Sequence, residues 1–215
     1  MIVAIDGPAG VGKSSIAKLV ALRAGMKYIN SGNLYRGITL NILDRYPNGP
    51  PEDSGLIIEI AKSCDFELVK GRLILNGKDV TEDLHTDKVD SWVAPVSSIV
   101  EVRQIVNKRL RELASREDSV VEGRDITTVV FPDAGVKIFL DASVETRAKR
   151  RYHQGTSSLT IREIAERIRE RDELDRSKKE GSMKISPDAH YLDTSVLTID
   201  QVCDKVLDKI QKMVQ

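Results

Sequence analysis

The stretch Gly7-Pro8-Ala9-Gly10-Val11-Gly12-Lys13-Ser14 decides the fold of this chain, because it matches the phosphate-binding loop pattern G-x-x-x-x-G-K-[ST]. It directly follows the apolar run Ile2-Val3-Ala4-Ile5, which is typical of a buried strand. A helix is expected after it, with apolar residues at Ile16, Leu19, Val20 and Leu22 and a stop at Gly25. The sequence therefore predicts a triphosphate-binding site in the context that this motif requires. An ordinary glycine turn with an incidental lysine is the alternative.

The chemistry of the loop follows from its residue types. Glycines let the backbone curl so that several N–H groups point at phosphate oxygens, and the helix that follows directs its positive end to the same place. Lys13 is expected to reach the β- and γ-phosphates, and the Ser14 hydroxyl to take a coordination position on Mg²⁺. The expected triphosphate-binding residues are Gly7, Pro8, Ala9, Gly10, Val11, Gly12, Lys13, Ser14 and Ser15.

Composition limits the possible partners. The chain has 215 residues, with 33 Lys and Arg against 33 Asp and Glu, so it has no overall positive field to hold a nucleic acid. Cys64 and Cys203 lie far apart without metal-like spacing, which favours buried thiols in a reducing compartment. No apolar run approaches the about 18 residues of a membrane span. We therefore expect a soluble cytoplasmic protein that binds neither nucleic acid nor membrane.

Short apolar runs alternate with helical patterns, which is typical of an α/β fold with a parallel sheet and helices on both faces. The five expected core strands are Ile2 to Asp6, Lys27 to Asn30, Ser119 to Glu122, Val136 to Leu140 and His190 to Asp193. Two helices are expected to begin with capping boxes, at Thr160 with Glu163 and at Thr198 with Gln201. The last helix repeats Val202, Val206, Ile210 and Met213 on one face.

Two segments interrupt this alternation. Residues 64–75 predict a small hairpin that turns at Lys70-Gly71, and Asn76-Gly77 predicts a further tight turn; a helix-breaking connector at residues 44–55 leads to it. The polar segment 154–158 between two arginine-rich helices is the expected site of a mobile lid.

Three clusters supply candidates for the second half of the site. Ser31 and Arg36 follow the second strand, where open α/β sheets bind ligands, although Ser31 could equally be a helix N-cap. Arg124 and Asp125 follow the third strand, either as a structural ion pair or as two ligand contacts. The third cluster lies on the helix expected from Ile161 to Lys179, where Arg171, Asp175 and Lys178 share one face, while its other charges, Asp172 among them, are expected to be solvated.

Arginines dispersed among segments that converge near one phosphate loop favour phosphoryl transfer, because its transition state needs positioning and charge neutralisation more than covalent chemistry. An acceptor phosphate is already anionic near neutral pH, so a dedicated general base is dispensable.

The chain resembles the bacterial cytidylate kinases over nearly its whole length. The resemblance is carried by the motifs Ile5-Asp6-Gly7-Pro8-Ala9-Gly10, Ser31-Gly32 with Tyr35-Arg36, Leu75-Asn76-Gly77-Lys78-Asp79-Val80-Thr81, Glu122-Gly123-Arg124-Asp125, Val129-Val130-Phe131-Pro132-Asp133-Ala134, Lys137-Ile138-Phe139-Leu140, Glu170-Arg171-Asp172 and Leu192-Asp193-Thr194-Ser195. It implies a P-loop nucleoside monophosphate kinase fold and phosphoryl transfer from ATP to CMP or dCMP, with Mg²⁺. It also implies a single domain over residues 1–215, with an acceptor-binding insertion at about 59–90 and a lid at about 152–160. A monomer is expected.

The resemblance also assigns roles. The expected CMP-binding residues are Ser31, Arg171 and Asp175 at the pentose, Arg36, Arg124 and Lys178 at its phosphate, and Arg103 and Asp125 at the cytosine. The expected catalytic residues are Lys13, Arg36, Arg124 and Lys178. Four positions depart from the family. Lys178 stands where an arginine is usual, Ala94 where a serine helps to read the cytosine amino group, His85 where an arginine is usual, and Ser15 where a threonine is frequent.

Other activities are less consistent with the sequence. A small-molecule P-loop kinase acting on UMP or on a non-nucleotide alcohol is the nearest rival. A GTPase would need D-x-x-G and N-K-x-D elements after the phosphate loop, and Asn107-Lys108-Arg109-Leu110 lacks the final aspartate.

Overall fold

The computed structural model describes residues 1–153, 159–178 and 180–214. The strands are β1 (Ile2–Asp6), β2 (Lys27–Asn30), β3 (Phe66–Val69), β4 (Arg72–Leu75), β5 (Lys78–Asp79), β6 (Ser119–Gly123), β7 (Val136–Asp141) and β8 (His190–Asp193). The α-helices are α1 (Lys13–Ala24), α2 (Ser31–Arg45), α3 (Ser54–Lys62), α4 (Asp87–Ser97), α5 (Val100–Ala114), α6 (Val144–His153), α7 (Ile161–Ser177) and α8 (Ile199–Val214). Two short helical segments are η1 (Thr81–His85) and η2 (Ile126–Val130). Residues 154–158 of the expected lid lie outside the described residues.

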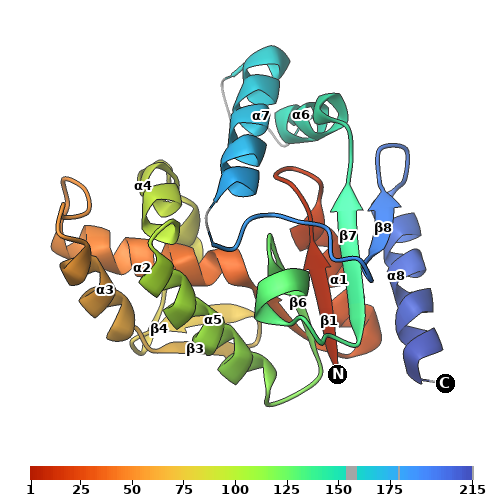
Figure 1. The fold of residues 1–215 in the computed structure, drawn as a ribbon, viewed down its shortest axis with the longest axis horizontal. Helices are drawn as coiled ribbons and strands as arrows, with labels where there is room; N and C mark the ends of the chain where they lie inside the picture. Colours follow the sequence, from red (N-terminus) through yellow and green to blue (C-terminus); the bar gives the residue numbers. More distant parts are fainter. Residues whose placement is uncertain (154–158, 179, 215) are drawn as a thin grey trace. The chain divides into compact units, whose positions relative to one another are not determined.

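The chain forms two compact units. The P-loop unit comprises Met1–Tyr28 and Glu117–Gln215, and the hairpin unit comprises Ile29–Arg116. The five-stranded sheet has the order β2-β6-β1-β7-β8. Figure 1 shows its strands β6, β1, β7 and β8 side by side in this order. β1 pairs in parallel with both β6 and β7, and β7 pairs in parallel with β8. All five predicted core strands are confirmed, with β6 and β7 one residue longer than expected.

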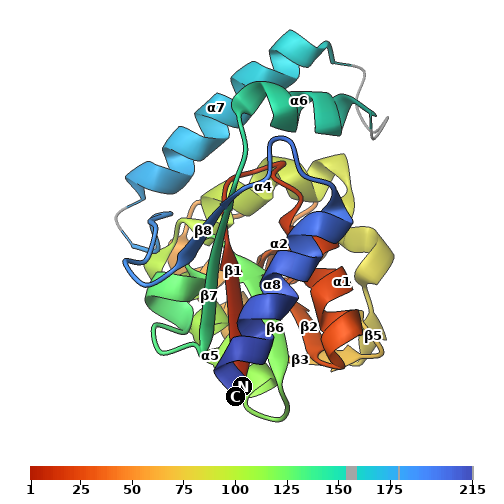
Figure 2. The same ribbon diagram turned by 90° about the vertical axis from the view of Figure 1, so that its right-hand side faces the viewer.

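The core of the P-loop unit forms where α1 and α8 pack on one face of this sheet (Figures 1 and 2). Val3 and Ile5 of β1 are completely buried, as an apolar run in a central parallel strand requires. Two residues expected on apolar helix faces are not covered, because Leu22 of α1 and Met213 in the last turn of α8 are 78% and 59% exposed. The buried stripe of α8 therefore ends at Ile210.

Helices α6 and α7 lie side by side as a helical hairpin with its own small apolar core (Figures 1 and 2). Ala148 of α6 packs with Ile164 and Ile168 of α7. The capping box at the start of α7 is confirmed by reciprocal hydrogen bonds between Thr160 and Glu163. The helix ends earlier than expected, at Ser177, since Lys178 already has an extended backbone.

The hairpin unit confirms the predicted turns. Lys70-Gly71 joins β3 to β4, and Asn76-Gly77 joins β4 to β5, with positive φ at all four residues, as two-residue type I′ turns require. Phe66 of β3 packs so closely against Gly37 of α2 that a Cβ at this glycine would lie 2.9 Å from the Phe66 ring. The hairpin thus shares its core with α2.

Cys64 and Cys203 are buried free thiols, as predicted. Within the described ranges, no helix is long and apolar enough to cross a membrane.

Gly7→Ala should destabilise the P-loop unit through a direct clash. A Cβ at Gly7 would lie 2.1 Å from the carbonyl oxygen of Leu140 on β7, and its φ of +153° strains any side chain there. The matched control is Gly25→Ala, whose φ of +65° also disfavours alanine but whose added Cβ meets nothing within 4 Å. In urea unfolding, we expect Gly25→Ala to cost about 1 kcal/mol and Gly7→Ala about 2 kcal/mol more. Equal losses would contradict the close approach of the loop to β7.

Candidate active site

The phosphate loop connects β1 to α1, as its motif predicts. Gly10 and Gly12 have φ values of +75° and +96°, which a residue with a Cβ rarely adopts, and Gly12 is the N-cap of α1. Lys13 begins that helix and is buried, with 6% of its surface exposed. Its Nζ donates a hydrogen bond of 2.8 Å to the carbonyl oxygen of Pro8, so the side chain folds back over the loop.

Burial dominates the electrostatics of Lys13. Burial lowers the pKa of its amine to about 7, and the guanidinium of Arg124 lowers it further, against the carboxylates of Glu122, Asp6 and Asp175. Lys13 therefore lies within electrostatic range of these four charged groups of the P-loop unit.

Glu122, at the end of β6, holds the serine that follows Lys13. The Ser14 hydroxyl donates a hydrogen bond of 2.5 Å to Glu122 Oε1, and the Tyr28 hydroxyl donates one of 3.0 Å to the same atom. Glu122 is only 3% exposed. The motif Glu122-Gly123-Arg124-Asp125 alone assigns this residue no role. The available signal was a carboxylate at the end of a strand expected beside the loop, and here Glu122 is in register with Ile5 of β1.

Asp6, the last residue of β1, was also missed. Its completely buried carboxylate accepts hydrogen bonds from the backbone N–H groups of Ile126 and Thr127, at 2.9 and 2.7 Å, and from the Thr127 hydroxyl at 2.7 Å. Burial raises the pKa of Asp6 to about 6, although the hydrogen bonds from Thr127 and Ile126 act in the opposite direction. Asp6 thereby fixes the segment after β6 that carries Arg124 and Asp125.

Asp175 gathers three of the predicted cations. Its carboxylate lies 3.0 Å from Arg124 Nε, 3.3 Å from Arg171 Nε and 2.9 Å from Lys178 Nζ. Burial would raise the pKa of Asp175, which is 1% exposed, but Arg124, Arg171 and Lys178 hold it well below its ordinary value. The carboxylate stays ionised, and three positive charges around one negative charge leave a net positive site. The prediction that Arg171, Asp175 and Lys178 meet is confirmed.

Asp172 differs from its predicted place on a solvated face. It is 3% exposed and forms an ion pair of 2.7 Å with Arg147 of α6, which is equally buried. The charge pattern of α7 alone could not show this, because the partner comes from the neighbouring helix. Asp125, by contrast, was a predicted ligand and is buried after β6, with 5% exposed.

The hairpin unit carries the other three predicted acceptor residues. Ser31 is the first residue of α2, and the N-cap is Asn30, whose Oδ1 accepts a hydrogen bond of 3.2 Å from the backbone N–H of Asn33. The alternative of Ser31 as N-cap is therefore wrong. Arg36 donates a hydrogen bond of 3.3 Å to the carbonyl oxygen of Leu84 and forms an ion pair with Asp90.

Arg103 is held within α5 at 4% exposure. Its Nη1 donates a hydrogen bond of 3.3 Å to the carbonyl oxygen of Ser97, and its guanidinium carbon lies 5.6 Å from the centre of the Tyr35 ring. An arginine over an aromatic face is stabilised by a cation–π interaction. The structure thus places Ser31, Arg36 and Arg103 in one unit and the phosphate loop with the Asp175 cluster in the other.

Comparison with known proteins relates this geometry to a family. The sequence model of the family described as cytidylate kinase matches residues 3–212. The chain belongs to the cytidylate kinase family. It is 42% identical over 211 residues to the cytidylate kinase of Borrelia duttonii (strain Ly), covering 96% of each chain. It is also 42% identical over 214 residues to cytidylate kinase 1 of Borreliella burgdorferi (strain ATCC 35210), covering 97% of this chain and 96% of the relative.

Solved structures agree on the fold alone. A crystal structure of an uncharacterized protein from Eubacterium ventriosum ATCC 27560 aligns with a TM-score of 0.55 and 14% identity, covering 98% of both chains. The structure of TT1252 from Thermus thermophilus aligns with a TM-score of 0.50 and 17% identity, covering 100% of this chain and 98% of that one. The cytidylate kinase family is a family of nucleoside monophosphate kinases, so the expected fold and enzyme class are both confirmed.

The lowered pKa of Lys13 predicts how stability depends on pH. Between about pH 7 and 10.5 the unfolded chain keeps the Lys13 proton and the folded chain does not, so the free energy of unfolding should rise with pH through this window. The contribution is about 1.4 kcal/mol per pH unit. Lys13→Met should remove that rise when urea unfolding is measured at several pH values. The exposed Lys149→Met on α6 serves as the control, and an equal slope in all three proteins would rule out the buried amine as its source.

Proposed function

We propose that this kinase transfers the γ-phosphoryl group of ATP to CMP or dCMP, giving ADP and CDP or dCDP. The observation that carries the proposal is the net positive cluster of Arg124, Arg171 and Lys178 around Asp175, in the same unit as the phosphate loop. A nucleoside monophosphate brings a phosphate dianion, and such a cluster offers it charge-assisted hydrogen bonds.

On the donor side, residues 7–15 hold the phosphates of ATP. The burial that lowers the pKa of Lys13 is offset when a polyphosphate lies beside the amine, because an opposite charge favours the charged form. A protonated Lys13 then neutralises the charge that develops on the transferring group.

The residues beside Lys13 suit Mg²⁺. The Ser14 hydroxyl and the Glu122 carboxylate, 2.5 Å apart, are hard oxygen groups of the kind this ion prefers. Among the described residues, no group of three or more His, Cys, Asp and Glu side chains could hold a metal ion, so substrate phosphates would complete the coordination. When bound, Mg²⁺ supplies charge neutralisation between the donor phosphates. Ser14 would hold it through the hydroxyl, with Glu122 orienting that group.

On the acceptor side, we assign Arg36, Arg124 and Lys178 to the phosphate of CMP and Ser31, Arg171 and Asp175 to its pentose. Lys178 offers a point charge rather than the two-pronged grip of arginine. Lys13, Arg36, Arg124 and Lys178 are the catalytic residues, because phosphoryl transfer needs positive groups around the moving phosphoryl and an acceptor that is already anionic.

Arg103 and Asp125 read the base. Cytosine presents an amino donor at N4 beside acceptors at N3 and O2, so a carboxylate and a guanidinium complement it. Uracil presents an acceptor at O4, which would repel the carboxylate. Ala94 cannot supply a hydroxyl, and the nearby Ser97 donates its own to the carbonyl oxygen of Ala94 at 3.0 Å. The specificity is therefore assigned chiefly to Asp125 and Arg103.

An acceptor panel tests the function. Purified protein with Mg·ATP should phosphorylate CMP and dCMP with a kcat/KM at least about tenfold above that for UMP or AMP, since one unsatisfied polar group costs this much discrimination. ADP release in a coupled assay and product identification by chromatography give the measurement. UMP or AMP turnover as efficient as that of CMP would contradict the proposal.

Asp125→Asn should weaken base discrimination, because an amide presents a donor as well as an acceptor. We expect the ratio of kcat/KM for CMP over UMP to fall about tenfold. Asp133→Asn is the matched control, since Asp133 is an exposed carboxylate after the same strand and segment. An unchanged ratio in Asp125→Asn would exclude Asp125 as the base reader, whatever the effect on total activity.

A further inference from the structure

A buried ion pair outside the residues assigned above holds one peptide unit of the phosphate loop. Arg147 of α6 and Asp172 of α7 are each 3% exposed and lie 2.7 Å apart. Arg147 Nη1 also donates a hydrogen bond of 2.9 Å to the carbonyl oxygen of Ala9, and the Ala9 N–H donates one of 3.3 Å to Asp172 Oδ1. Both backbone groups of Ala9 are therefore bound by this pair.

The helical hairpin packs onto the same part of the loop. A Cβ at Gly10 would lie 3.4 Å from Arg147 Cβ and 3.7 Å from Ile168 Cδ1, so the next residue of the loop also lies against α6 and α7. Arg147 is anchored at its other edge, where Nε donates a hydrogen bond of 2.9 Å to the carbonyl oxygen of Ala142. Its guanidinium thus bridges the base of α6, the loop and α7.

This arrangement determines which way the Ala9 backbone faces. Because the peptide bond is trans, the Ala9 carbonyl oxygen held by Arg147 turns the N–H of Gly10 to the opposite side. In a loop that binds phosphate through backbone N–H groups, a rotated peptide would present a carbonyl oxygen there instead. Both polar groups of Ala9 are bound on the side of the helical hairpin of α6 and α7. Rotation of its peptides would therefore leave a buried charge or a buried polar group unsatisfied. The pair therefore keeps the loop in one conformation before the donor arrives.

We infer that Asp172, acting through Arg147 and the backbone of Ala9, is a positioning residue for the donor triphosphate. The inference concerns the donor half of the proposed reaction and rests on it. Asp172 also lies one turn before Asp175 on α7, so one helix holds the donor loop and organises the acceptor cations. A merely structural ion pair would affect stability and leave donor binding unchanged.

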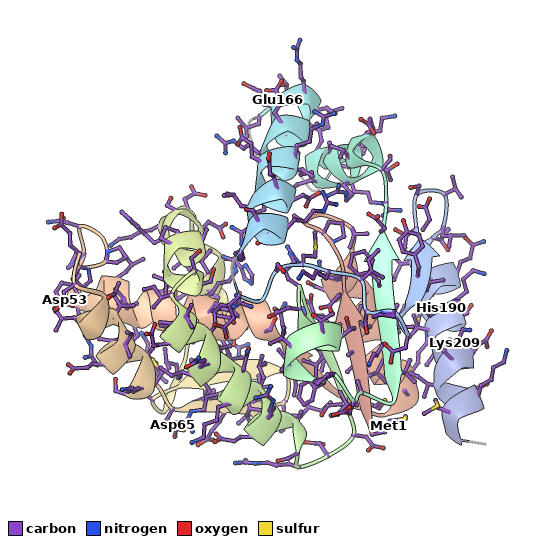
Figure 3. All side chains as sticks on the ribbon, in the orientation of Figure 1. Met1, Asp53, Asp65, Glu166, His190 and Lys209 are labelled. Carbon is purple, nitrogen blue, oxygen red and sulfur yellow. The ribbon has the colours of Figure 1, made fainter. Side chains whose placement is uncertain are left out.

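The test measures binding of Mg·ATP by isothermal titration calorimetry without acceptor, well below the unfolding temperature of each variant. Asp172→Asn should weaken binding about tenfold, because the charge that holds Arg147 against Ala9 is lost. The control is Glu166→Gln on the same helix, an exposed residue that points outward and pairs with Arg162 at 3.4 Å (Figure 3). It should change binding less than twofold, as removal of an exposed ion pair does. Unchanged binding in Asp172→Asn, with only a lower unfolding temperature, would overturn the inference.

An apolar replacement of the pair separates stability from positioning. Removing one partner of a buried ion pair strands the other charge, whereas replacing both with apolar residues often restores stability. Arg147→Met combined with Asp172→Leu should therefore recover the unfolding temperature but keep the weakened ATP binding. Recovery of both would assign the pair a structural role and refute the inference.

The single variants Arg147→Met and Asp172→Leu complete a double-mutant cycle. Because both side chains act through the same peptide, the double variant should bind ATP no more weakly than Asp172→Leu alone. If the losses of ATP-binding free energy in the two single variants add in the double variant, Arg147 makes a separate contact with ATP. That result would contradict the inference that both side chains act through the Ala9 peptide. If wild type binds Mg·ATP but does not phosphorylate CMP, the proposed acceptor is wrong while these binding measurements still decide the role of Asp172.

Discussion

The site of the P-loop unit depends on the need to satisfy buried carboxylates. Asp6, Glu122, Asp172 and Asp175 are each at most 3% exposed, and an ionised carboxylate without partners is too costly to bury. Each one therefore fixes a different group. Asp6 fixes the chain after β6, and Glu122 fixes the Ser14 hydroxyl. Asp172 fixes the Ala9 peptide together with Arg147, and Asp175 fixes Arg124, Arg171 and Lys178. The conformation of the site follows from the contacts of these four carboxylates together.

Buried carboxylates and their partners add little stability, because well-packed apolar residues can replace a buried ion pair at little or no cost in free energy. Their value here is geometric. An apolar core would hold the loop in place without selecting the direction of its peptide groups, whereas a carboxylate beside an N–H and a guanidinium beside a carbonyl oxygen select one direction. The apolar contacts of Ala148 with Ile164 and Ile168 join α6 to α7, and the polar contacts of the same two helices orient the loop.

The sequence predicted those parts that local chemistry determines. The loop motif, the five core strands, the turns at Lys70-Gly71 and Asn76-Gly77 and the capping box at Thr160 all depend on residues close together in the chain, and all were found as expected. The meeting of Arg171 and Asp175 followed from helical spacing, whereas Lys178 reaches Asp175 from just beyond the end of α7. Asp172 was misplaced because its partner Arg147 lies 25 positions earlier, on another helix. Asp6 and Glu122 received no role for the same reason, since their partners become neighbours only when β1 and β6 pair.

Positive groups lie close together in the P-loop unit and are partly balanced by carboxylates. A site for several phosphates must hold an excess of positive charge, and that excess repels itself in the free protein. Asp175 reduces the repulsion among three cations, and the pKa of Lys13, lowered to about 7, allows this buried amine to lose its proton. Burial and the nearby guanidinium of Arg124 therefore limit the positive charge that these groups carry together.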